Sequence, residues 1–223
     1  ITGDIDRSPL CSLMWAAFRK AIALDSRLSE DILMLDGMSG RQYRRFINNL
    51  IGSLPNARYL EVGSWMGSTA CSAIYGNQVK VTCIDNWSEF GGPRDKFELN
   101  IASVLTDKVE FNFVENDFRK VDYKSLGKYN VYLFDGPHSY EDQRDGLLVA
   151  LDALDNESIF IVDDMNAVGV GPGTWDAIKS QNLEVLCAIE ILSTQDGSHP
   201  EIWGPQSSWH NGYLISVLRK PFK

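Results

Sequence analysis

The stretch Tyr59-Leu60-Glu61-Val62-Gly63-Ser64-Trp65-Met66-Gly67-Ser68-Thr69 decides the fold of this chain. A short apolar run ends in an acid and a glycine, and a second glycine opens a helical pattern, which predicts a strand, a tight turn and a helix N-terminus. A dinucleotide-binding turn needs glycine where Trp65 stands, because the backbone must approach a pyrophosphate there. The segment therefore predicts a nucleotide-type cradle and argues against NAD or FAD as its ligand.

Composition indicates one globular domain that acts on small molecules. The chain has 223 residues, of which 44% are hydrophobic, and its formal net charge is -9. A chain of this length buries a substantial core. Because non-specific affinity for nucleic acid depends on clustered Lys and Arg, we expect no nucleic-acid partner for so acidic a chain.

The same composition predicts a cytoplasmic protein. No run of about 18 apolar residues occurs and no signal-peptide pattern opens the sequence, so we expect no membrane contact. The cysteines are scattered over predicted helices and strands, which favours buried thiols in a reducing compartment over disulfides or a metal site. They are Cys11, Cys71, Cys83 and Cys187.

Three helices are predicted before the turn, in an extension of residues 1–56 that precedes a main domain of residues 57–223. Apolar residues recur at three- and four-residue spacing from Leu10 to Ile22, which favours a first helix. Ser29 is predicted to cap a short second helix, and Ser39 with Gln42 is predicted to form a capping box for a third. We expect the extension to pack on the sheet edge, to cover a substrate side or to form the interface of a homodimer.

After the turn, strand and helix patterns alternate, which predicts βαβ crossovers and a doubly wound, mainly parallel α/β sheet of the Rossmann type. Seven strands are expected, at residues 58–62, 79–84, 109–114, 130–134, 158–162, 184–192 and 212–218. Helices are expected at residues 68–75, 93–105, 140–154 and 174–181. The last two strands have no helix between them, so they are expected to pair antiparallel.

Open α/β sheets bind their ligands at the carboxyl ends of the strands. The second predicted strand after the first helices ends at Asp85, whose carboxylate can accept both hydroxyl groups of a ribose. Trp87 follows it and could cover the face of an adenine ring. Asp85 is therefore predicted to bind the ribose of an adenosine-containing cofactor.

The E-x-G-x-x-x-G pattern of Glu61, Gly63 and Gly67 resembles the first motif of the class I S-adenosylmethionine-dependent methyltransferases. This resemblance implies that the acid and the turn hold the methionine end of a cofactor without phosphate, and that Asp117 and the next backbone amide meet the adenine. The cofactor-binding residues predicted in this way are Glu61, Gly63, Ser64, Trp65, Gly67, Ser68, Asp85, Asn86, Trp87, Asp117, Phe118 and Asp135.

Three further acids follow neighbouring strands: Asp135 after the fourth, and Asp163 and Asp164 after the fifth. Carboxylates this close repel one another unless a cation neutralises them, and oxygen ligands suit Mg²⁺. The pattern resembles that of the metal-dependent small-molecule O-methyltransferases of the catechol, macrocin and sugar types. The resemblance implies a divalent ion, Mg²⁺ or a similar cation, held by Asp135, Asp163 and Asp164.

His138 and Asp135 are the predicted catalytic residues. His138 stands where the catechol type has a lysine base, and an imidazole with an ordinary pKa near 6.5 can accept a hydroxyl proton at neutral pH. The alternative is that His138 only orders the start of the helix that Ser139 caps. Pro137 replaces the second acid of the similar D-G-D-H-S-Y segment of bacterial and viral methyltransferases, which removes one possible metal ligand.

The sequence thus predicts an S-adenosylmethionine-dependent methyltransferase that acts on a hydroxyl group of a sugar, phenol or natural-product intermediate, with help from a divalent metal. Two alternatives remain, a nicotinamide-dependent oxidoreductase and a non-catalytic domain that binds the same cofactor. Residues 167–173 are glycine-rich and expected to flex, whereas residues 193–211, which include Trp203 and Trp209, are expected to form a binding loop.

Overall fold

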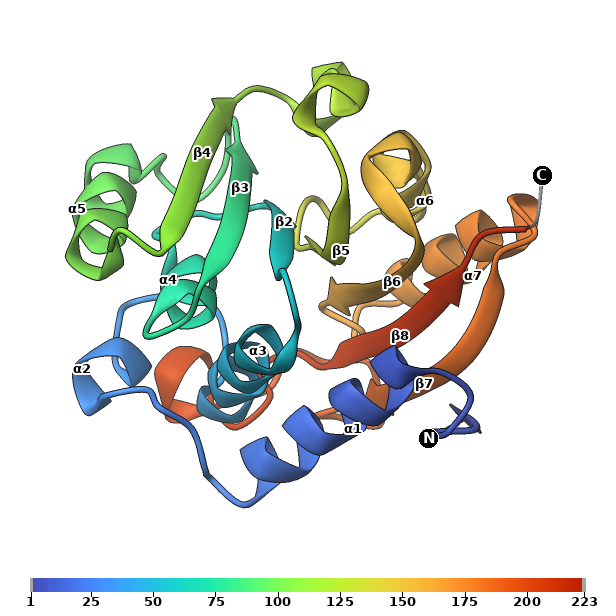
Figure 1. Cartoon of the computed structure of the whole chain (residues 1–223), viewed down its shortest axis with the longest axis horizontal. Coiled ribbons are helices and arrows are strands. Elements are labelled where there is room, and N and C mark those ends of the chain that lie inside the picture. Colours follow the sequence, from blue (N-terminus) through green and yellow to red (C-terminus); the bar gives the residue numbers. More distant parts are fainter. Residues whose placement is uncertain (1, 222–223) are drawn as a thin grey trace.

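An eight-stranded sheet with helices on both faces forms the centre of the molecule (Figure 1). The computed structural model describes residues 2–221 of the chain. The strand order is β1-β7-β8-β6-β5-β2-β3-β4. The strands are β1 (Thr2–Gly3), β2 (Arg58–Val62), β3 (Val79–Asp85), β4 (Val109–Glu115), β5 (Tyr129–Phe134), β6 (Leu154–Asp163), β7 (Glu184–Ile191) and β8 (Tyr213–Arg219).

The helices cover the two faces of this sheet in two groups. They are α1 (Pro9–Ile22), α2 (Glu30–Leu33), α3 (Arg41–Ser53), α4 (Ser68–Ile74), α5 (Arg94–Val104), α6 (Tyr140–Ala150) and α7 (Val170–Ser180). One hydrophobic cluster joins α1, α3, α4 and α5 to one face, and a second joins α6 and α7 to the other. Along β5, Val131 and Leu133 belong to the first cluster and Tyr132 and Phe134 to the second, as the two-residue period of a strand requires.

Strand direction confirms the predicted α/β sheet and extends it. From β6 through β5, β2 and β3 to β4 all neighbours pair parallel, whereas β8 is antiparallel to both β6 and β7. Each of the seven predicted strands is present. The additional strand is β1, which pairs antiparallel with β7 and is too short to show an alternating pattern in the sequence.

Two local predictions were wrong. The N-cap of α3 is Gly40, not Ser39, because the Ser39 hydroxyl is engaged with the Arg44 guanidinium and with Ser68. The glycine-rich stretch 167–173 is partly helical, since α7 begins at Val170. Its glycines serve close packing there: a Cβ on Gly173 would lie 2.3 Å from the carbonyl oxygen of Tyr140, at the start of α6.

The predicted fate of the cysteines is confirmed: all four are free and buried. In the described part of the chain, no helix combines the length and apolar character needed to cross a membrane.

Strand register brings the ends of the central strands to one edge of the sheet. Val62 at the end of β2 is level with Ile84 of β3 and Phe134 of β5, and Phe134 is level with Val162 of β6. The residues that follow these strands therefore meet at a single edge, where the strand order reverses between β2 and β5.

Candidate active site

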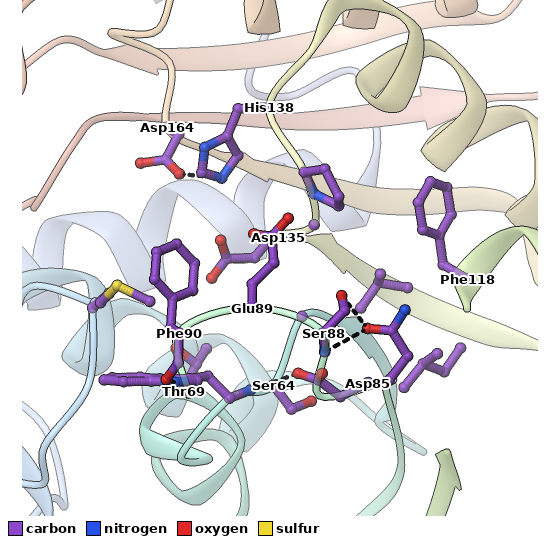
Figure 2. Close-up of a pocket in the computed structure, with 18 of the residues that line it drawn as sticks. Ser64, Thr69, Asp85, Ser88, Glu89, Phe90, Phe118, Asp135, His138 and Asp164 are labelled. Atoms are coloured by element: carbon purple, nitrogen blue, oxygen red, sulfur yellow. Dashed lines mark hydrogen bonds and ion pairs between the residues drawn. The ribbon is translucent and has the colours of Figure 1, made fainter. Parts of the chain in front are cut away.

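A cavity of about 430 Å³ opens at this edge of the sheet, within the size range of pockets for small molecules and cofactors (Figure 2). It is lined by the residues that follow β2, β3, β4, β5 and β6, by the segment between α2 and α3, and by the connection between β7 and β8. Of the predicted site residues, it contains Ser64, Trp65, Gly63, Ser68, Asp85, Asn86, Asp117, Phe118, Asp135, His138 and Asp164.

The turn after β2 is shaped by glycine. Gly63 has a φ of +84°, and a Cβ there would lie 1.8 Å from the backbone oxygen of Asp135 on the neighbouring strand end. Gly67, with a φ of +78°, is the N-cap of α4 and does not itself line the cavity. Between them Trp65 has a φ of +41°, a strained value for a bulky residue of the kind found at functional sites.

Glu61 lies beneath this turn and is fully buried. The Tyr59 hydroxyl donates a hydrogen bond of 2.5 Å to its Oε2 atom. Burial raises the pKa of Glu61 to about 7, although the hydrogen bond from Tyr59 and the nearby Ser64 hydroxyl oppose the shift. A buried carboxyl group with so high a pKa is charged in only part of the molecules at neutral pH, and a cationic group in the cavity would favour its ionised form.

Asp85 connects the turn after β2 to the loop after β3. Its Oδ2 atom accepts a hydrogen bond of 2.8 Å from the Trp65 amide, and its Oδ1 atom accepts one of 2.8 Å from the Trp87 amide. Each oxygen keeps a second lone pair, so the half-exposed carboxylate can still accept bonds from a diol. Asn86 lines the cavity beside it and accepts bonds from the amide and hydroxyl of Ser88.

The ring of Trp87 does not lie where the sequence analysis expected it. Trp87 is outside the cavity lining, stacks on Phe113 with ring centroids 5.3 Å apart, and meets Phe97 edge-on at 5.4 Å. It therefore belongs to the apolar packing between β4 and α5. A tryptophan in the loop after β3 can bury its ring on this side of the sheet because Phe97 and Phe113 offer an apolar surface.

The end of β4 supplies the opposite wall of the cavity. Asp117 accepts a hydrogen bond of 3.0 Å from the Arg119 amide, which caps a short 3-10 helix that begins at Phe118. The Arg119 guanidinium lies 4.4 Å from the centroid of the Phe118 ring. It also pairs with Asp142 and Asp145 on α6, so its charge is already matched.

A cluster of three titratable side chains occupies another part of the cavity. His138 Nε2 lies 2.5 Å from Asp164 Oδ2, and the Asn211 amide donates to Asp164 Oδ1 at 2.7 Å. Ligand atoms of Asp135, His138 and Asp164 all lie within 4.8 Å of one another. Figure 2 shows the His138 imidazole directed at Asp164, with Asp135 below them.

Asp163 is not one of this group, although the sequence analysis placed it among the metal ligands. It is buried, and its Oδ1 atom accepts a hydrogen bond of 2.7 Å from the Asp164 amide. Asp164 itself has a φ of +58°, which ends the strand geometry between the two acids. As a result Asp164 lines the cavity and Asp163 does not.

The charges of this cluster are strongly coupled. Burial and the neighbouring acids raise the pKa values of Asp135 and Asp163 well above their usual range. Burial lowers the pKa of His138, but the hydrogen bond and charge of Asp164, together with the charges of Glu89 and Asp142, outweigh it and the net shift is upward. Burial raises the pKa of Asp164, but the hydrogen bond and charge of His138, together with the hydrogen bond from Asn211, outweigh it and the net shift is downward.

Several lining residues were not predicted from the sequence. Met38 comes from the segment between α2 and α3, Glu89 and Phe90 come from the loop after β3, and Thr69 from α4. The others include Asn116, Arg119, Pro137, His199, His210 and Asn211. His199, His210 and Asn211 lie in residues 193–211, which were predicted to form a binding loop, although the residues of this loop that line the cavity were not predicted one by one.

The comparisons with known proteins agree with this geometry. Residues 60–165 match a family described as "Methyltransferase domain". These residues extend from the middle of β2 to just beyond β6, and so include Glu61, Asp85, Asp135 and Asp164. No curated protein matches the chain.

Solved structures of methyltransferases share the fold at low sequence identity. TrmN from Thermus thermophilus has a TM-score of 0.55 at 17% identity, with 92% of this chain and 52% of that chain covered. A candidate O-methyltransferase from Klebsiella pneumoniae has a TM-score of 0.54 at 15% identity, covering 98% and 92%. A candidate RNA methyltransferase, PH1948 from Pyrococcus horikoshii, has a TM-score of 0.55 at 12% identity, covering 96% and 99%. At these identities the likeness shows the fold alone, and the chain spans about half the length of TrmN.

Proposed function

We propose, from the premise that residues 60–165 are a methyltransferase domain, that the chain binds S-adenosylmethionine and transfers its methyl group to a hydroxyl group of a small molecule. The observation that carries the hydroxyl acceptor is the 2.5 Å contact between His138 Nε2 and Asp164 Oδ2 inside the cavity. A histidine oriented by a carboxylate is a common acceptor for a hydroxyl proton.

The residues present fit the cofactor. The Gly63–Ser68 turn lets the backbone approach a ligand, Asp85 offers free lone pairs to a ribose, and Phe118 with Asp117 supplies an apolar face beside polar groups for a base. The bound cofactor would supply an electrophilic methyl group on a sulfonium. The chain's own contribution is to orient that group toward the acceptor and to keep water out.

His138 is the proposed proton acceptor. The Asp164 carboxylate holds the imidazole in one orientation and stabilises its protonated form, and Asn211 in turn fixes Asp164 through a bond of 2.7 Å. Because Nε2–H of the neutral imidazole donates to Asp164, the acceptor hydroxyl would lie against Nδ1 and lose its proton to that nitrogen as the oxygen is methylated. His210 is not suited to this task, since burial lowers its pKa to about 4 and its Nδ1 accepts a bond from the Gly204 amide.

A divalent cation is the second proposed occupant of the same three side chains. Two carboxylates and an imidazole within 4.8 Å fit a metal ion chemically, and the ligands would be Asp135, Asp164 and His138. The ion would lower the pKa of an acceptor hydroxyl bound to it. The two uses of the His138 imidazole exclude each other, because a neutral imidazole that ligates a metal through one nitrogen carries its proton on the other and cannot accept a second.

Charge in the cavity favours a small acceptor over nucleic acid. Five acids line it, namely Asp85, Glu89, Asp117, Asp135 and Asp164, and Arg119, already paired with two acids, is the one lysine or arginine among the described lining residues. The whole chain carries a formal net charge of -9, and this acidic lining offers little attraction for phosphates.

Calorimetric titration of cofactor-stripped protein with S-adenosylhomocysteine tests the cofactor, and a methyl-transfer assay with sugars and phenols tests the acceptor. We expect micromolar binding and turnover of at least one acceptor. Binding without turnover would support the non-catalytic alternative, and absence of binding would refute the proposal.

The same assay with excess Mg²⁺ and with a chelator separates the two uses of His138. Chelator-sensitive turnover is the result expected of a metal site, whereas chelator-insensitive turnover that His138→Gln abolishes is expected of the His138–Asp164 pair alone.

A further inference from the structure

Arg44 is a fully buried cation on α3 for which the site described so far gives no use. Its side chain has no exposed surface, and it forms no ion pair with any residue in the described range 2–221. Burial lowers the pKa of Arg44 to about 10, so it remains protonated at neutral pH. A buried and unpaired guanidinium is costly, and it is tolerated only where other groups satisfy its donors.

The Arg44 donors are satisfied by one short segment of backbone. Nη1 donates to the carbonyl oxygens of Leu33 at 3.0 Å and Leu35 at 2.7 Å. Nε donates to the carbonyl oxygen of Ser39 at 3.1 Å and to its hydroxyl at 3.0 Å. The guanidinium thus fixes both ends of residues 33–39, the segment between α2 and α3 that carries Met38 into the cavity.

This segment contacts the cofactor side of the cavity directly. The hydroxyl groups of Ser39 and Ser68 lie 3.2 Å apart, and Ser68 is both the first residue of α4 and part of the lining. A Cβ on Gly37 would lie 2.0 Å from Ser68 Oγ. Residues 33–39 are therefore packed closely against the start of α4.

The segment and α3 also contact the connection between β7 and β8. The Arg41 amide donates to the Ser207 carbonyl oxygen at 2.9 Å, and the Gln42 amide to that of Ser208 at 3.0 Å. A Cβ on Gly204 would lie 2.8 Å from the Gly37 carbonyl oxygen. His210 and Asn211, which follow in the same connection, line the cavity.

We infer that Arg44 is a positioning residue of the active site, which holds residues 33–39 in place and through Ser39 fixes Ser68 in the wall of the cofactor cavity. The inference rests on the proposed function, because it takes the cavity to be the cofactor site. It gives the N-terminal extension a role in ligand binding, and not only in covering the sheet.

The test compares S-adenosylhomocysteine affinity among Arg44→Lys, Ser39→Ala and the control Arg45→Lys, well below the unfolding temperature of each. Lysine keeps the charge but lacks the planar fork needed to bind Leu33, Leu35 and Ser39 together. Arg45 is the neighbouring half-buried arginine, and within the described part of the chain its guanidinium donates to the Arg41 carbonyl oxygen alone.

We expect Arg44→Lys and Ser39→Ala to weaken the affinity about fivefold to tenfold, the effect of one lost hydrogen bond on ligand placement, and Arg45→Lys to leave it unchanged. Faster amide hydrogen exchange in residues 33–39 of Arg44→Lys should accompany the loss. A purely structural role would lower the unfolding temperature of Arg44→Lys while the folded protein bound normally.

Wild-type affinity in both Arg44→Lys and Ser39→Ala would overturn the inference and leave the proposed function intact. Ser39→Ala keeps the guanidinium and its bonds to Leu33 and Leu35, so it answers the question even if Arg44→Lys does not fold. Failure of the wild-type protein to bind S-adenosylhomocysteine would instead refute the proposed function, and the role of Arg44 with it.

Discussion

Single side chains in this cavity have properties that their position in the sequence does not show. Asp163 and Asp164 are consecutive, yet one is buried behind the site and the other contacts His138 at 2.5 Å. Burial raises the pKa of Glu61 to about 7. The pKa of Asp164, which is also buried, is instead lowered by its contacts with His138 and Asn211. The chemistry of each carboxyl group is therefore set by its immediate partners.

His138→Gln is expected to lower the rate at saturating acceptor by about 10²-fold or more if the imidazole accepts the hydroxyl proton. In the wild-type protein the rate should rise with pH through a pKa above 6.5, because the hydrogen bond with Asp164 raises that of His138. Asp164→Asn should move this rise in rate to lower pH. If the rate rises at the same pH in His138→Gln and Asp164→Asn as in the wild-type protein, His138 only orders the start of α6.

Glu61→Gln should be more stable than the wild-type protein at pH 8 and equally stable at pH 4. The pKa of Glu61 is raised from 4.5 to about 7 in the folded protein, so the folded state binds this proton more tightly than the unfolded chain. Stability from this group is complete below pH 4.5 and is lost as the pH rises to about 7. The difference at pH 8 should reach roughly 3 kcal/mol at most.

Urea unfolding of both proteins at pH 4, 6 and 8 measures this effect. A difference between variant and wild type that stays constant over that range would show that Glu61 keeps an ordinary pKa.

At the scale of elements, the turn between β2 and α4 is held by contact with the end of β5. Gly63 and Gly91 both have positive φ, at +84° and +81°, but their surroundings differ. A Cβ on Gly63 would lie 1.8 Å from the Asp135 backbone oxygen. A Cβ on Gly91 would have no described heavy atom within 4 Å apart from those of its two neighbours in the chain.

Gly63→Ala should therefore destabilise the protein by more than Gly91→Ala. The Gly91 variant measures the cost of the positive φ alone, about 1–3 kcal/mol. The excess reports the close approach of the turn to Asp135, and S-adenosylhomocysteine binding should weaken with it. Thermal unfolding and calorimetry of both variants check this. Equal losses would mean that the turn can move away from β5 at no cost.

At the scale of the whole molecule, the N-terminal helices and the sheet share one hydrophobic cluster. Tyr43 and Phe46 of α3 are fully buried in the same cluster as Val131 of β5 and Ile215 of β8. The ring of Tyr43 stacks on that of Tyr213 with centroids 3.9 Å apart. Helix α3 thus shares a core with β5 and β8 as well as with the neighbouring helices.

A fragment of residues 57–223 should not unfold cooperatively, because removing α1 and α3 exposes that face of the sheet to water. Circular dichroism and thermal unfolding of the fragment and of the whole chain provide the measurement. A fragment that unfolds in one sharp transition and binds S-adenosylhomocysteine would show that the extension is a separate unit.

The sequence by itself determined the order of strands and helices, the glycine turn and the placement of Asp85, Asp135 and Asp164 at one edge. It could do so because apolar periodicity is local and because parallel strands, once recognised, must end on the same side. These features need no knowledge of which distant segments meet.

Only the tertiary structure decided which side chains face the cavity. Trp87 turned toward Phe97 and Phe113, Asp164 rather than Asp163 reached His138, and Arg44 fixed residues 33–39 against α4. Consecutive side chains at a strand end can point to opposite sides, and the choice depends on packing and hydrogen-bond partners far away in the chain. Such long-range contacts leave no pattern in the neighbouring residues from which they could be predicted.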